Sequence, residues 1–400
     1  MVRLNDIKQA AKRLKDVVYK TPLTYSYSLS ELSRANVFLK LENLQRTGSF
    51  KIRGAYNKLY KIKGTGRRVI AASAGNHAQG VALAARLLGM KATLIMPEGT
   101  PINKIVAVRR YGADVFLYGN AFDDAYKYAR QLETESGDLF IHAFDDPDVI
   151  AGQGTIGLEI IESLKNVEAV LVPVGGGGLI SGVSTAIKET NPRIKIIGVQ
   201  SKNAPSMSIS LKKGTVVETG SGQTIADGIA IKRVGALTFE IVKKYVDDII
   251  SVNDNEIEEA LLLLTERKRI VVEGAGAAGL AGLFKRKNKF YKKNVLILIS
   301  GGNIDINILA KIIERGLVKN GRFIRLIVEL PDIPGSLGKL TSLLGSLKAN
   351  IVQIFHDRFS RNLPINRAIV EISLETKSFE HQREVIILLR ENGYNPKEKT

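Results

Sequence analysis

The sequence of 400 residues contains no cysteine. This absence excludes disulfide bonds, thiolate metal sites and cysteine nucleophiles, and it gives no support for secretion. The first residues lack the apolar segment of a signal peptide, and no apolar run is long enough to cross a bilayer. We therefore expect a cytoplasmic protein with no membrane partner.

Acidic residues are also scarce. The chain has 40 Asp and Glu against 58 Lys and Arg, a formal charge of +18. Such a surplus would suit a nucleic-acid binder, an alternative that a steep salt dependence of binding would support. However, the basic stretches are dispersed among acidic residues, without zinc-finger spacing or an aromatic-basic RNA-binding signature. We favour a basic solvated surface that concentrates anionic ligands such as a phosphorylated cofactor, and we expect no nucleic-acid partner.

The length of the chain predicts two or more domains, because 400 residues exceed one small core. Short apolar strands alternate with helical patterns over most of the chain, which indicates a parallel sheet with helices on its faces. The predicted strands are 37–41, 68–72, 92–96, 113–117, 169–174, 196–199 and 295–299, and the predicted helices are 6–18, 52–59, 76–88, 101–111, 121–133, 152–164 and 179–188.

The pattern changes near residue 320. The predicted strands there are 323–330, 350–356 and 367–374, and the predicted helices are 337–347 and 379–392. This β-α-β-β-α order, with a short final strand after residue 394, is typical of a ferredoxin-like split βαβ unit. We therefore expect one domain at residues 1–320 and a small α+β domain at residues 321–400.

Four consecutive glycines, Gly175–Gly178, lie between a predicted buried strand and a helix that begins near Leu179. Without side chains, their backbone N–H groups can converge on an anion, and the helix adds about half a positive charge. The run is neither a Walker loop nor a good dinucleotide fingerprint. A flexible turn is the alternative, but such turns rarely need four glycines at a strand–helix junction. We predict a phosphate cradle.

Lys51 is the candidate reactive residue. By default it would be a solvated surface lysine, but its neighbours Phe50 and Ile52 are apolar. A lysine in apolar surroundings loses proton affinity, because desolvation disfavours the charged form. A neutral amine is what Schiff-base chemistry with an aldehyde cofactor requires.

Two further turns follow predicted strands. The turn Ser73–His77 offers N–H groups and the Ser73 hydroxyl to a carboxylate, and the Asn76 amide has both a donor and an acceptor. Helix capping by Ser73 or Asn76 would explain the same residues equally well. Ser300 follows the strand 295–299, at the edge where open α/β sheets bind ligands, although it could equally be a turn serine.

In combination, these motifs resemble the β-family (fold type II) of pyridoxal-phosphate enzymes and, within it, the threonine dehydratases (threonine ammonia-lyases). The resemblance covers about residues 5–315, and the ordered set is far more specific than any one motif. The matching stretches are Ser49–Ala55, Ser73–Gly80, Gly152–Thr155, Gly175–Gly178, Thr224–Gly228, Glu273–Ala277 and Ser300–Asn303. The resemblance implies an α/β catalytic domain in two open-sheet lobes, the smaller at about residues 45–145. By the same analogy we expect a homodimer or homotetramer.

The resemblance also implies which residues act. Lys51 would bind the cofactor, pyridoxal 5′-phosphate, through a Schiff base and later remove the substrate Cα proton. Phe50 would pack against the pyridine ring, Asn76 would bond the ring 3′-oxygen, and Ser300 would face the ring nitrogen. The phosphate would be held by Gly175, Gly176, Gly177, Gly178 and the amide of Leu179; Gly228 would leave room near the ring; and Ser73, Ala74, Gly75, Asn76 and His77 would bind the substrate carboxylate.

The implied chemistry is β-elimination. A serine hydroxyl cannot keep the ring nitrogen protonated as a carboxylate would, so a long-lived carbanion is disfavoured. Threonine would lose its Cα proton and its hydroxyl, giving 2-oxobutyrate and ammonia, and serine would give pyruvate. A serine-preferring dehydratase stays open, because hydrophobic pockets discriminate one methyl group by only about 10–200-fold.

Two departures from relatives limit the alternatives. Serine racemase, another family member, has a serine as a second acid/base where this chain has Ala74, so we expect little racemisation. Relatives with a divalent-cation site supply carboxylates where this chain has Gln200 and Ser206. That metal site is therefore in doubt, and we assign no metal ligand.

The C-terminal segment resembles an ACT domain, a small-molecule sensing module, through Leu330–Leu337. Gly335 would let a ligand or partner chain approach the backbone. The resemblance leaves open an amino-acid effector such as isoleucine or valine, a nucleotide, or a dimerisation domain without ligand. A role in isoleucine biosynthesis depends on that effector. A non-catalytic amino-acid sensor is the remaining alternative, and the presence of Lys51, a phosphate cradle and Ser300 in one chain argues against it.

Overall fold

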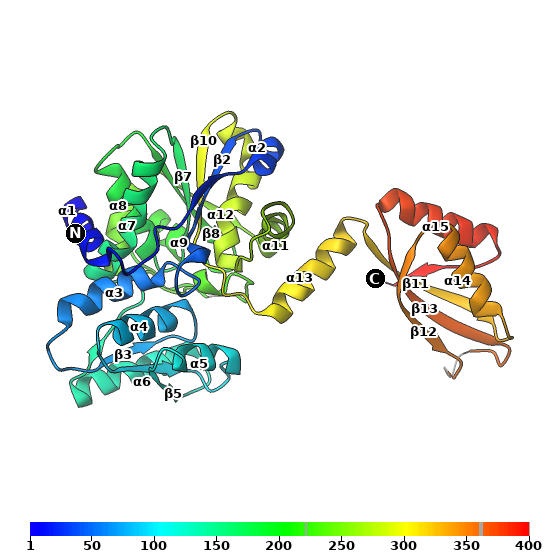
Figure 1. Cartoon of the computed structure of the whole chain (residues 1–400), viewed down its shortest axis with the longest axis horizontal. Coiled ribbons are helices and arrows are strands. Elements are labelled where there is room, and N and C mark those ends of the chain that lie inside the picture. Colours follow the sequence, from blue (N-terminus) through cyan, green and yellow to red (C-terminus); the bar gives the residue numbers. More distant parts are fainter. Residues whose placement is uncertain (221, 360–362, 400) are drawn as a thin grey trace. The chain divides into compact units, whose positions relative to one another are not determined.

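The computed structural model describes residues 1–220, 222–359 and 363–399. The chain divides into two compact units, Met1–Ile304 and Asp305–Thr400, and each is described by itself (Figure 1). The expected boundary near residue 320 falls at the end of α13 (Ile306–Lys319), the helix with which the second unit begins. The division of functions between the two units stays a prediction.

The larger lobe of the first unit is built on a six-stranded sheet in the order β1-β2-β10-β7-β8-β9. All neighbouring strands are parallel except β1 and β2. Parallel strands must be connected by crossovers, which carry helices over both faces. The strands are β1 (Leu23–Tyr25), β2 (Asn36–Leu41), β7 (Ala169–Pro173), β8 (Lys195–Ser201), β9 (Asp248–Val252) and β10 (Asn294–Ile299).

Helices cover both faces of this sheet. On one face, residues of α7 and α8 share a core with Val170, Val172 and Leu296. On the other face lies α12, where glycines 279 and 282 leave room for the side chains of Ile297 and Val199. The helices of this lobe are α1 (Leu4–Leu14), α2 (Tyr27–Ser33), α7 (Pro147–Ser163), α8 (Gly178–Lys188), α9 (Ser206–Lys213), α10 (Ala236–Tyr245), α11 (Asp254–Leu263) and α12 (Gly274–Lys285).

The smaller lobe contains a parallel four-stranded sheet in the order β5-β4-β3-β6. Alternate residues of β3 face opposite sides: Val69 and Ala71 pack with α3 and α4, and Ile70 packs with α6. The strands are β3 (Val69–Ala72), β4 (Ala92–Met96), β5 (Asp114–Leu117) and β6 (Leu139–Phe140), and the helices are α3 (Lys51–Ile62), α4 (Asn76–Leu87), α5 (Ile102–Arg109) and α6 (Phe122–Ser136). The two open-sheet lobes of the predicted α/β fold are thus confirmed.

One helix boundary differs clearly from the prediction. The pattern predicts a helix from residue 152, whereas α7 begins five residues earlier, at Pro147. The Asp146 carboxylate accepts hydrogen bonds from the N–H groups of Asp148 (2.8 Å) and Val149 (3.1 Å). Asp as N-cap with Pro at the first helical position is a strong start signal, and the apolar pattern alone does not register it. The segment from 202 to 293, for which no element is predicted, contains β9 and α9 to α12.

The second unit has the predicted ferredoxin-like order. Its sheet is β12-β13-β11-β14, with every neighbouring pair antiparallel. Buried and more exposed residues alternate along β11, which indicates one face against the core and one outside. The elements are β11 (Phe323–Pro331), α14 (Ser336–Ser346), β12 (Asn350–Asp357), β13 (Arg367–Glu375), α15 (Phe379–Glu391) and the short final strand β14 (Lys397–Glu398).

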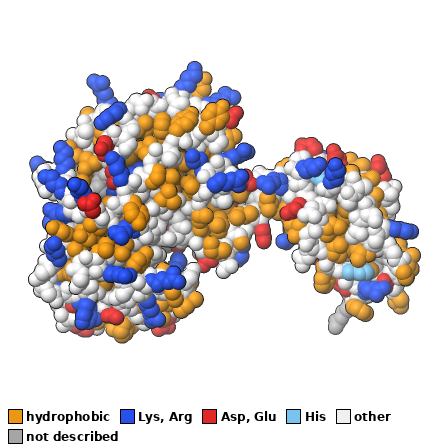
Figure 2. Space-filling model, viewed as in Figure 1, with side chains coloured by type: hydrophobic (Ala, Val, Ile, Leu, Met, Phe, Trp, Pro, Cys, Tyr) orange, Lys and Arg blue, Asp and Glu red, His pale blue; other side chains and the backbone are white. Residues whose placement is uncertain are grey.

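The distribution of charge on the surface can be compared with the dispersed basic surface that the sequence predicts. On the face in Figure 2, Lys and Arg side chains are scattered over the first unit with hydrophobic and polar side chains between them. This distribution agrees with a dispersed basic surface. In the part of the chain that the structure describes, no helix has both the length and the hydrophobicity to cross a membrane.

Candidate active site

Lys51 is the first residue of α3, at the end of a loop that passes through Gly48. Its Nζ donates a hydrogen bond to the carbonyl oxygen of Ala143 (3.1 Å) and lies 5.2 Å from the centroid of the Phe50 ring. Burial lowers the pKa of Lys51 to about 8, although the Glu273 carboxylate opposes the shift. The predicted loss of proton affinity is confirmed, and near neutral pH much more of this amine is neutral than in a solvated lysine.

The loop before Lys51 is attached to the end of β10. Ser49 pairs with Gly301 in an isolated β-bridge, and the N–H of Phe50 donates to the carbonyl oxygen of Ser300 (3.2 Å). Ser300 is 3% exposed. The carboxyl end of a strand near the middle of the larger sheet therefore lies beside the candidate lysine, as open α/β sheets place their ligand sites.

Asn76 lies in the same place. It begins α4, and its Oδ1 accepts a hydrogen bond from Asn303 (2.7 Å), while its Nδ2 donates to both carboxylate oxygens of Glu273 (2.8 and 3.0 Å). Burial raises the pKa of Glu273 to about 7, although the hydrogen bond from Asn76 opposes the shift. The structure therefore brings Asn76 and Lys51 to the same Glu273 carboxylate, and the backbone of Ser300 lies beside the loop that carries Lys51. Asn76, Glu273 and Asn303 together form a polar cluster.

The turn Ser73–His77 is not capped in the way that the alternative explanation requires. The N-cap of α4 is Gly75, and no side chain caps the helix. Instead, the Ser73 hydroxyl accepts a hydrogen bond from the N–H of Gly75 (3.1 Å), which leaves its own proton free to bind an anion. Ala74 is half-buried in the same turn.

The side chain of His77 is turned away from this role. It is 5% exposed, and its Nε2 lies 2.9 Å from the carbonyl oxygen of Ile141, to which it donates. Burial, reinforced by the charge of Lys51, lowers the pKa of His77 to about 3. The ring is therefore neutral at physiological pH, and only the backbone of His77 is available to a carboxylate.

The four glycines form a buried loop between β7 and α8. Among the described residues, none accepts a hydrogen bond from the backbone N–H groups of Gly175, Gly176, Gly177 or Gly178. Gly177 has φ +97°, a conformation that favours glycine, and a Cβ on Gly176 would lie 2.4 Å from the Phe144 ring. Free donors at a helix N-terminus are a suitable site for a phosphate.

The cradle and the lysine are linked through adjacent residues. Ala143, whose carbonyl accepts from Lys51, precedes Phe144, whose ring packs on the cradle. Gly228 lies beside the polar cluster, since a Cβ there would be 3.7 Å from Oε1 of Glu273. Its neighbour Ile229 contacts Gly175, so this turn also connects the two ends of the site.

Comparisons with known proteins agree with this geometry. The sequence model described as "Pyridoxal-phosphate dependent enzyme" matches residues 14–301. The chain belongs to this family. An L-threonine ammonia-lyase of Thermotoga maritima is 51% identical over 396 residues, covering 98% of each chain.

Two solved structures of the family extend the comparison. The processed form of threonine deaminase isoform 2 from Solanum lycopersicum has a TM-score of 0.75 and 42% identity, covering 78% of this chain and 86% of that one. A maize serine racemase has a TM-score of 0.74 and 33% identity, covering 80% of this chain and 98% of that one. The predicted fold type II catalytic fold is confirmed.

Pyridoxal phosphate is thus the cofactor of this family member, and the residues present fit it. Unpaired backbone donors suit its phosphate, and a lysine with lowered pKa suits its aldehyde. The individual contacts predicted for Phe50, Gly228, Ser300 and the cradle stay predictions.

Sequence reasoning assigned no role to two members of the polar cluster, Glu273 and Asn303. Both stand inside stretches that match the family, Glu273–Ala277 and Ser300–Asn303. A carboxylate and an amide inside otherwise small-residue motifs are the signal that would have found them.

The described residues contain no group of three or more His, Cys, Asp or Glu side chains that could hold a metal ion. Gln200 and Ser206 are both fully buried, and the side-chain oxygen of Gln200 accepts a hydrogen bond from the N–H of Ser208 (3.1 Å).

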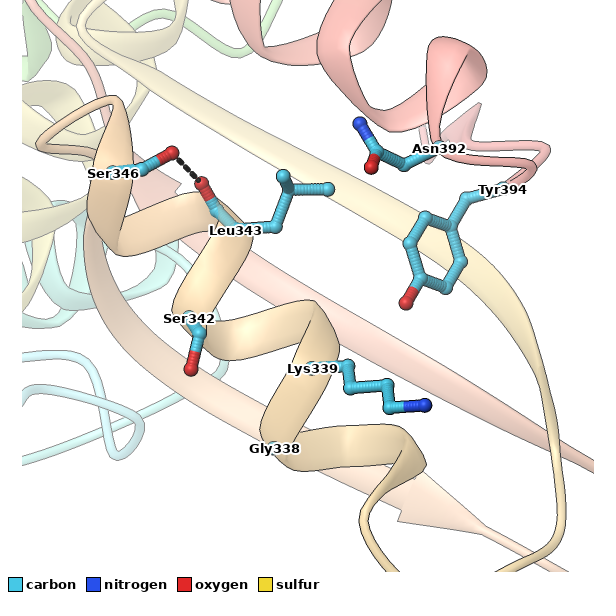
Figure 3. Close-up of a pocket in the computed structure, with 7 residues that line it drawn as sticks. All are labelled: Gly338, Lys339, Ser342, Leu343, Ser346, Asn392 and Tyr394. Atoms are coloured by element: carbon cyan, nitrogen blue, oxygen red, sulfur yellow. Dashed lines mark hydrogen bonds between the residues drawn. The ribbon is translucent and has the colours of Figure 1, made fainter.

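A separate open groove lies in the second unit, with a volume of about 710 Å³. Figure 3 shows Lys339 and Leu343 projecting from α14 toward the side where Tyr394 and Asn392, which follow α15, lie; Ser342 also lines the groove. This groove contains none of the residues of the lysine site.

Proposed function

We propose that this enzyme converts L-threonine into 2-oxobutyrate and ammonia, with L-serine as a second substrate that gives pyruvate. The observation that carries the proposal is the joining of Lys51, with its pKa lowered to about 8, to a cradle of unpaired N–H groups through Ala143 and Phe144. The 51% identity to an L-threonine ammonia-lyase supports the choice of substrate.

The bound cofactor supplies an electron sink that weakens the bond to the substrate Cα proton. The residues of the chain do the rest. Lys51 holds the cofactor until the substrate amine displaces it, and its neutral amine then accepts the Cα proton. The N–H groups and the Ser73 hydroxyl at the start of α4 hold the substrate carboxylate. The Cβ–O bond breaks, water leaves, and hydrolysis of the resulting enamine releases ammonia and the 2-oxo acid.

Racemisation is the second candidate activity, because a maize serine racemase shares 33% identity with this chain. Ala74 argues against it. The turn that would carry a second acid/base presents a methyl group, which cannot transfer a proton to the opposite face of Cα. We therefore propose elimination with little D-serine formation.

The proposal is tested by incubating the pyridoxal-phosphate-loaded protein with L-threonine or L-serine and assaying 2-oxo acid, ammonia and D-serine. We expect keto acid from both substrates, and we expect Lys51→Ala to lower turnover by more than about 10³-fold, since it removes both the cofactor link and the base. Keto acid from serine alone would favour the serine-preferring alternative. D-serine formed as fast as pyruvate would refute the prediction from Ala74.

The second unit is proposed to be a regulatory, ACT-like module that binds an amino-acid or nucleotide effector. Its ferredoxin-like order and the groove beside Lys339 support the proposal. In the groove, the Lys339 ammonium suits an anionic group, the Tyr394 hydroxyl can donate a hydrogen bond, and Leu343 offers apolar contact. Assembly into a homodimer or homotetramer is proposed as well, by analogy with the family.

The regulatory proposal is tested by titrating isoleucine, valine and AMP into the activity assay. An effect of one of them that Lys339→Ala and Tyr394→Phe weaken, without a change in unliganded turnover, would support the groove. Turnover that none of these compounds alters would favour the dimerisation alternative.

A further inference from the structure

Three polar side chains from separate segments form a relay around Asn76. Nδ2 of Asn303 donates to the Thr47 carbonyl oxygen (2.8 Å) and to Oδ1 of Asn76 (2.7 Å). Nδ2 of Asn76 donates in turn to both carboxylate oxygens of Glu273. We propose that Asn303 and Glu273 are positioning residues, which hold the Asn76 amide so that an N–H group, and not its carbonyl, is presented to the ring oxygen of the cofactor. This inference rests on the role proposed for Asn76.

The direction of the relay follows from its two ends. A side-chain amide has nearly the same shape after a 180° flip, so only its partners decide which atom is the donor. The carbonyl of Thr47 can only accept, and therefore Nδ2 of Asn303 must face it and Oδ1 of Asn76. The carboxylate of Glu273 also only accepts, so Nδ2 of Asn76 must face Glu273. Both ends select the same orientation.

One N–H group of Asn76 remains for a ligand. The amide nitrogen carries two hydrogens, and the bond to Glu273 uses one of them, shared between two oxygens. The only acceptor atom of the amide is already engaged by Asn303. In this arrangement Asn76 has a donor to offer, whereas a flipped amide would present its carbonyl.

Two glycines provide the space that the relay needs. A Cβ on Gly48 would lie 2.3 Å from Oδ1 of Asn303, and a Cβ on Gly301 would lie 2.3 Å from Oε1 of Glu273. Gly48 also has φ +69°, which side chains rarely adopt. A side chain at either glycine would therefore displace a member of the relay.

The charges around Glu273 act on its carboxylate. Lys51 and Lys104 favour its ionised form, and Asp227 disfavours it, in a site where burial raises the pKa to about 7. Only the ionised form accepts at both oxygens. A protonated Glu273 would carry a hydroxyl donor that faces the Asn76 donor, and the orientation would lose one of its two determinants.

A donor at the ring oxygen has an optical consequence. The donor stabilises the ionised ring oxygen. The cofactor absorbs at long wavelength when this oxygen is ionised and at shorter wavelength when it is protonated. The donor also contributes to cofactor affinity. The relay should therefore set both the spectrum of the bound cofactor and its dissociation constant, which loss of packing alone would not change together.

The test uses the holoenzyme and two isosteric variants, Asn303→Asp and Glu273→Gln. The control is Gln382→Glu in the second unit, which also alters a buried amide, one that donates to the Phe323 carbonyl and the Thr376 hydroxyl. We expect both relay variants to lower the ratio of long- to short-wavelength absorption and to weaken binding of pyridoxal phosphate by about tenfold. The control should change neither quantity.

The inference is overturned if both relay variants keep the wild-type spectrum and cofactor affinity. It is distinct from the proposed function, which fails if the wild-type protein shows no visible band with pyridoxal phosphate. If a variant fails to fold, the pH dependence of the wild-type holoenzyme spectrum tests the relay instead. Its long-wavelength absorption should decline as acid protonates Glu273, and a band that stays constant until the protein unfolds would refute the relay.

Discussion

The glycine cradle and the lysine end of the candidate site offer a ligand different parts of the chain. In the cradle, backbone N–H groups of four glycines are the donors, and these groups have no accessible pKa. At the lysine end, the functional groups are side chains, and two of them, Lys51 and Glu273, have pKa values shifted by burial. The cradle should thus be sensitive to added volume and insensitive to pH, whereas the lysine end should respond to charge.

The largest effect on stability is expected at Arg53, which is fully buried on α3, two residues after Lys51 at the lysine end. Its guanidinium donates to Glu42 (2.8 Å) and Glu159 (2.6 Å). Arg53→Met would leave the fully buried Glu42 without this partner, and we expect a loss of about 3–5 kcal/mol in the free energy of unfolding. Urea unfolding of the apo protein measures it.

The control for this prediction is an exposed ion pair. Lys20 and Glu162 lie 2.9 Å apart with side chains 60% and 66% exposed, so solvent screens the pair and Lys20→Met should cost far less stability than Arg53→Met. If Arg53→Met were no more destabilising than Lys20→Met, the charge network would not support α3.

A second prediction concerns the cradle. In Gly176→Ala the added methyl would lie 2.4 Å from the Phe144 ring, so we expect a loss of stability of up to about 3 kcal/mol. The displaced loop should also bind pyridoxal phosphate more weakly at every pH. Thermal unfolding and a cofactor titration measure the two effects.

Gly345→Ala is the matched control, because a Cβ at this position in α14 meets nothing within 4 Å. That change should be neutral or stabilising by up to about 1 kcal/mol. An unchanged cofactor affinity in Gly176→Ala would mean that the loop is not the phosphate site.

A smaller effect, specific to the lysine end, should follow pH. Because burial raises the pKa of Glu273 from 4.5 to about 7, the folded apo protein holds this proton more tightly than the unfolded chain. Its contribution to stability is complete below the unfolded pKa and is lost as pH rises through the folded pKa. Between about pH 5 and pH 7 we expect about 2 kcal/mol to be lost through this group.

Unfolding measurements on wild type and Glu273→Gln at those two pH values test this sign. Relative to wild type, the variant should gain stability as the pH rises. If the stabilities of wild type and Glu273→Gln changed equally with pH, the predicted pKa of Glu273 would be contradicted. If the stability of Gly176→Ala relative to wild type also rose with pH, the contrast between the cradle and the lysine end would be lost.

Local patterns were sufficient to select candidate site residues that have distinctive immediate neighbours. Lys51 was identified from Phe50 and Ile52, and the cradle from four glycines between a strand and a helix. The alternation of strands and helices predicted a parallel sheet covered by helices and the C-terminal ferredoxin-like unit, and the family resemblance added the division into two open-sheet lobes. The start of α7 was missed because its signal is the Asp146-Pro147 cap and not an apolar period.

The relay illustrates what local patterns do not contain. Asn76 was weighed against a capping role, and the structure shows that it caps nothing and instead bonds Glu273 and Asn303, 197 and 227 residues away. Sequence alone does not distinguish His77 from its neighbours in the turn, but its ring is directed to the Ile141 carbonyl. Which way a side chain points depends on segments that sequence order does not place next to one another.

The sequence by itself determined the local features of this protein: the sheets, the glycine loop of the cradle and the apolar neighbours of the lysine. These follow from periodicity, backbone freedom and desolvation, which act over a few residues. Only the tertiary structure decided the orientation of the Asn76 amide and the raised pKa of Glu273. Hydrogen-bond direction and burial depend on which distant groups share one site, and the two lobes bring those groups together only in the folded chain.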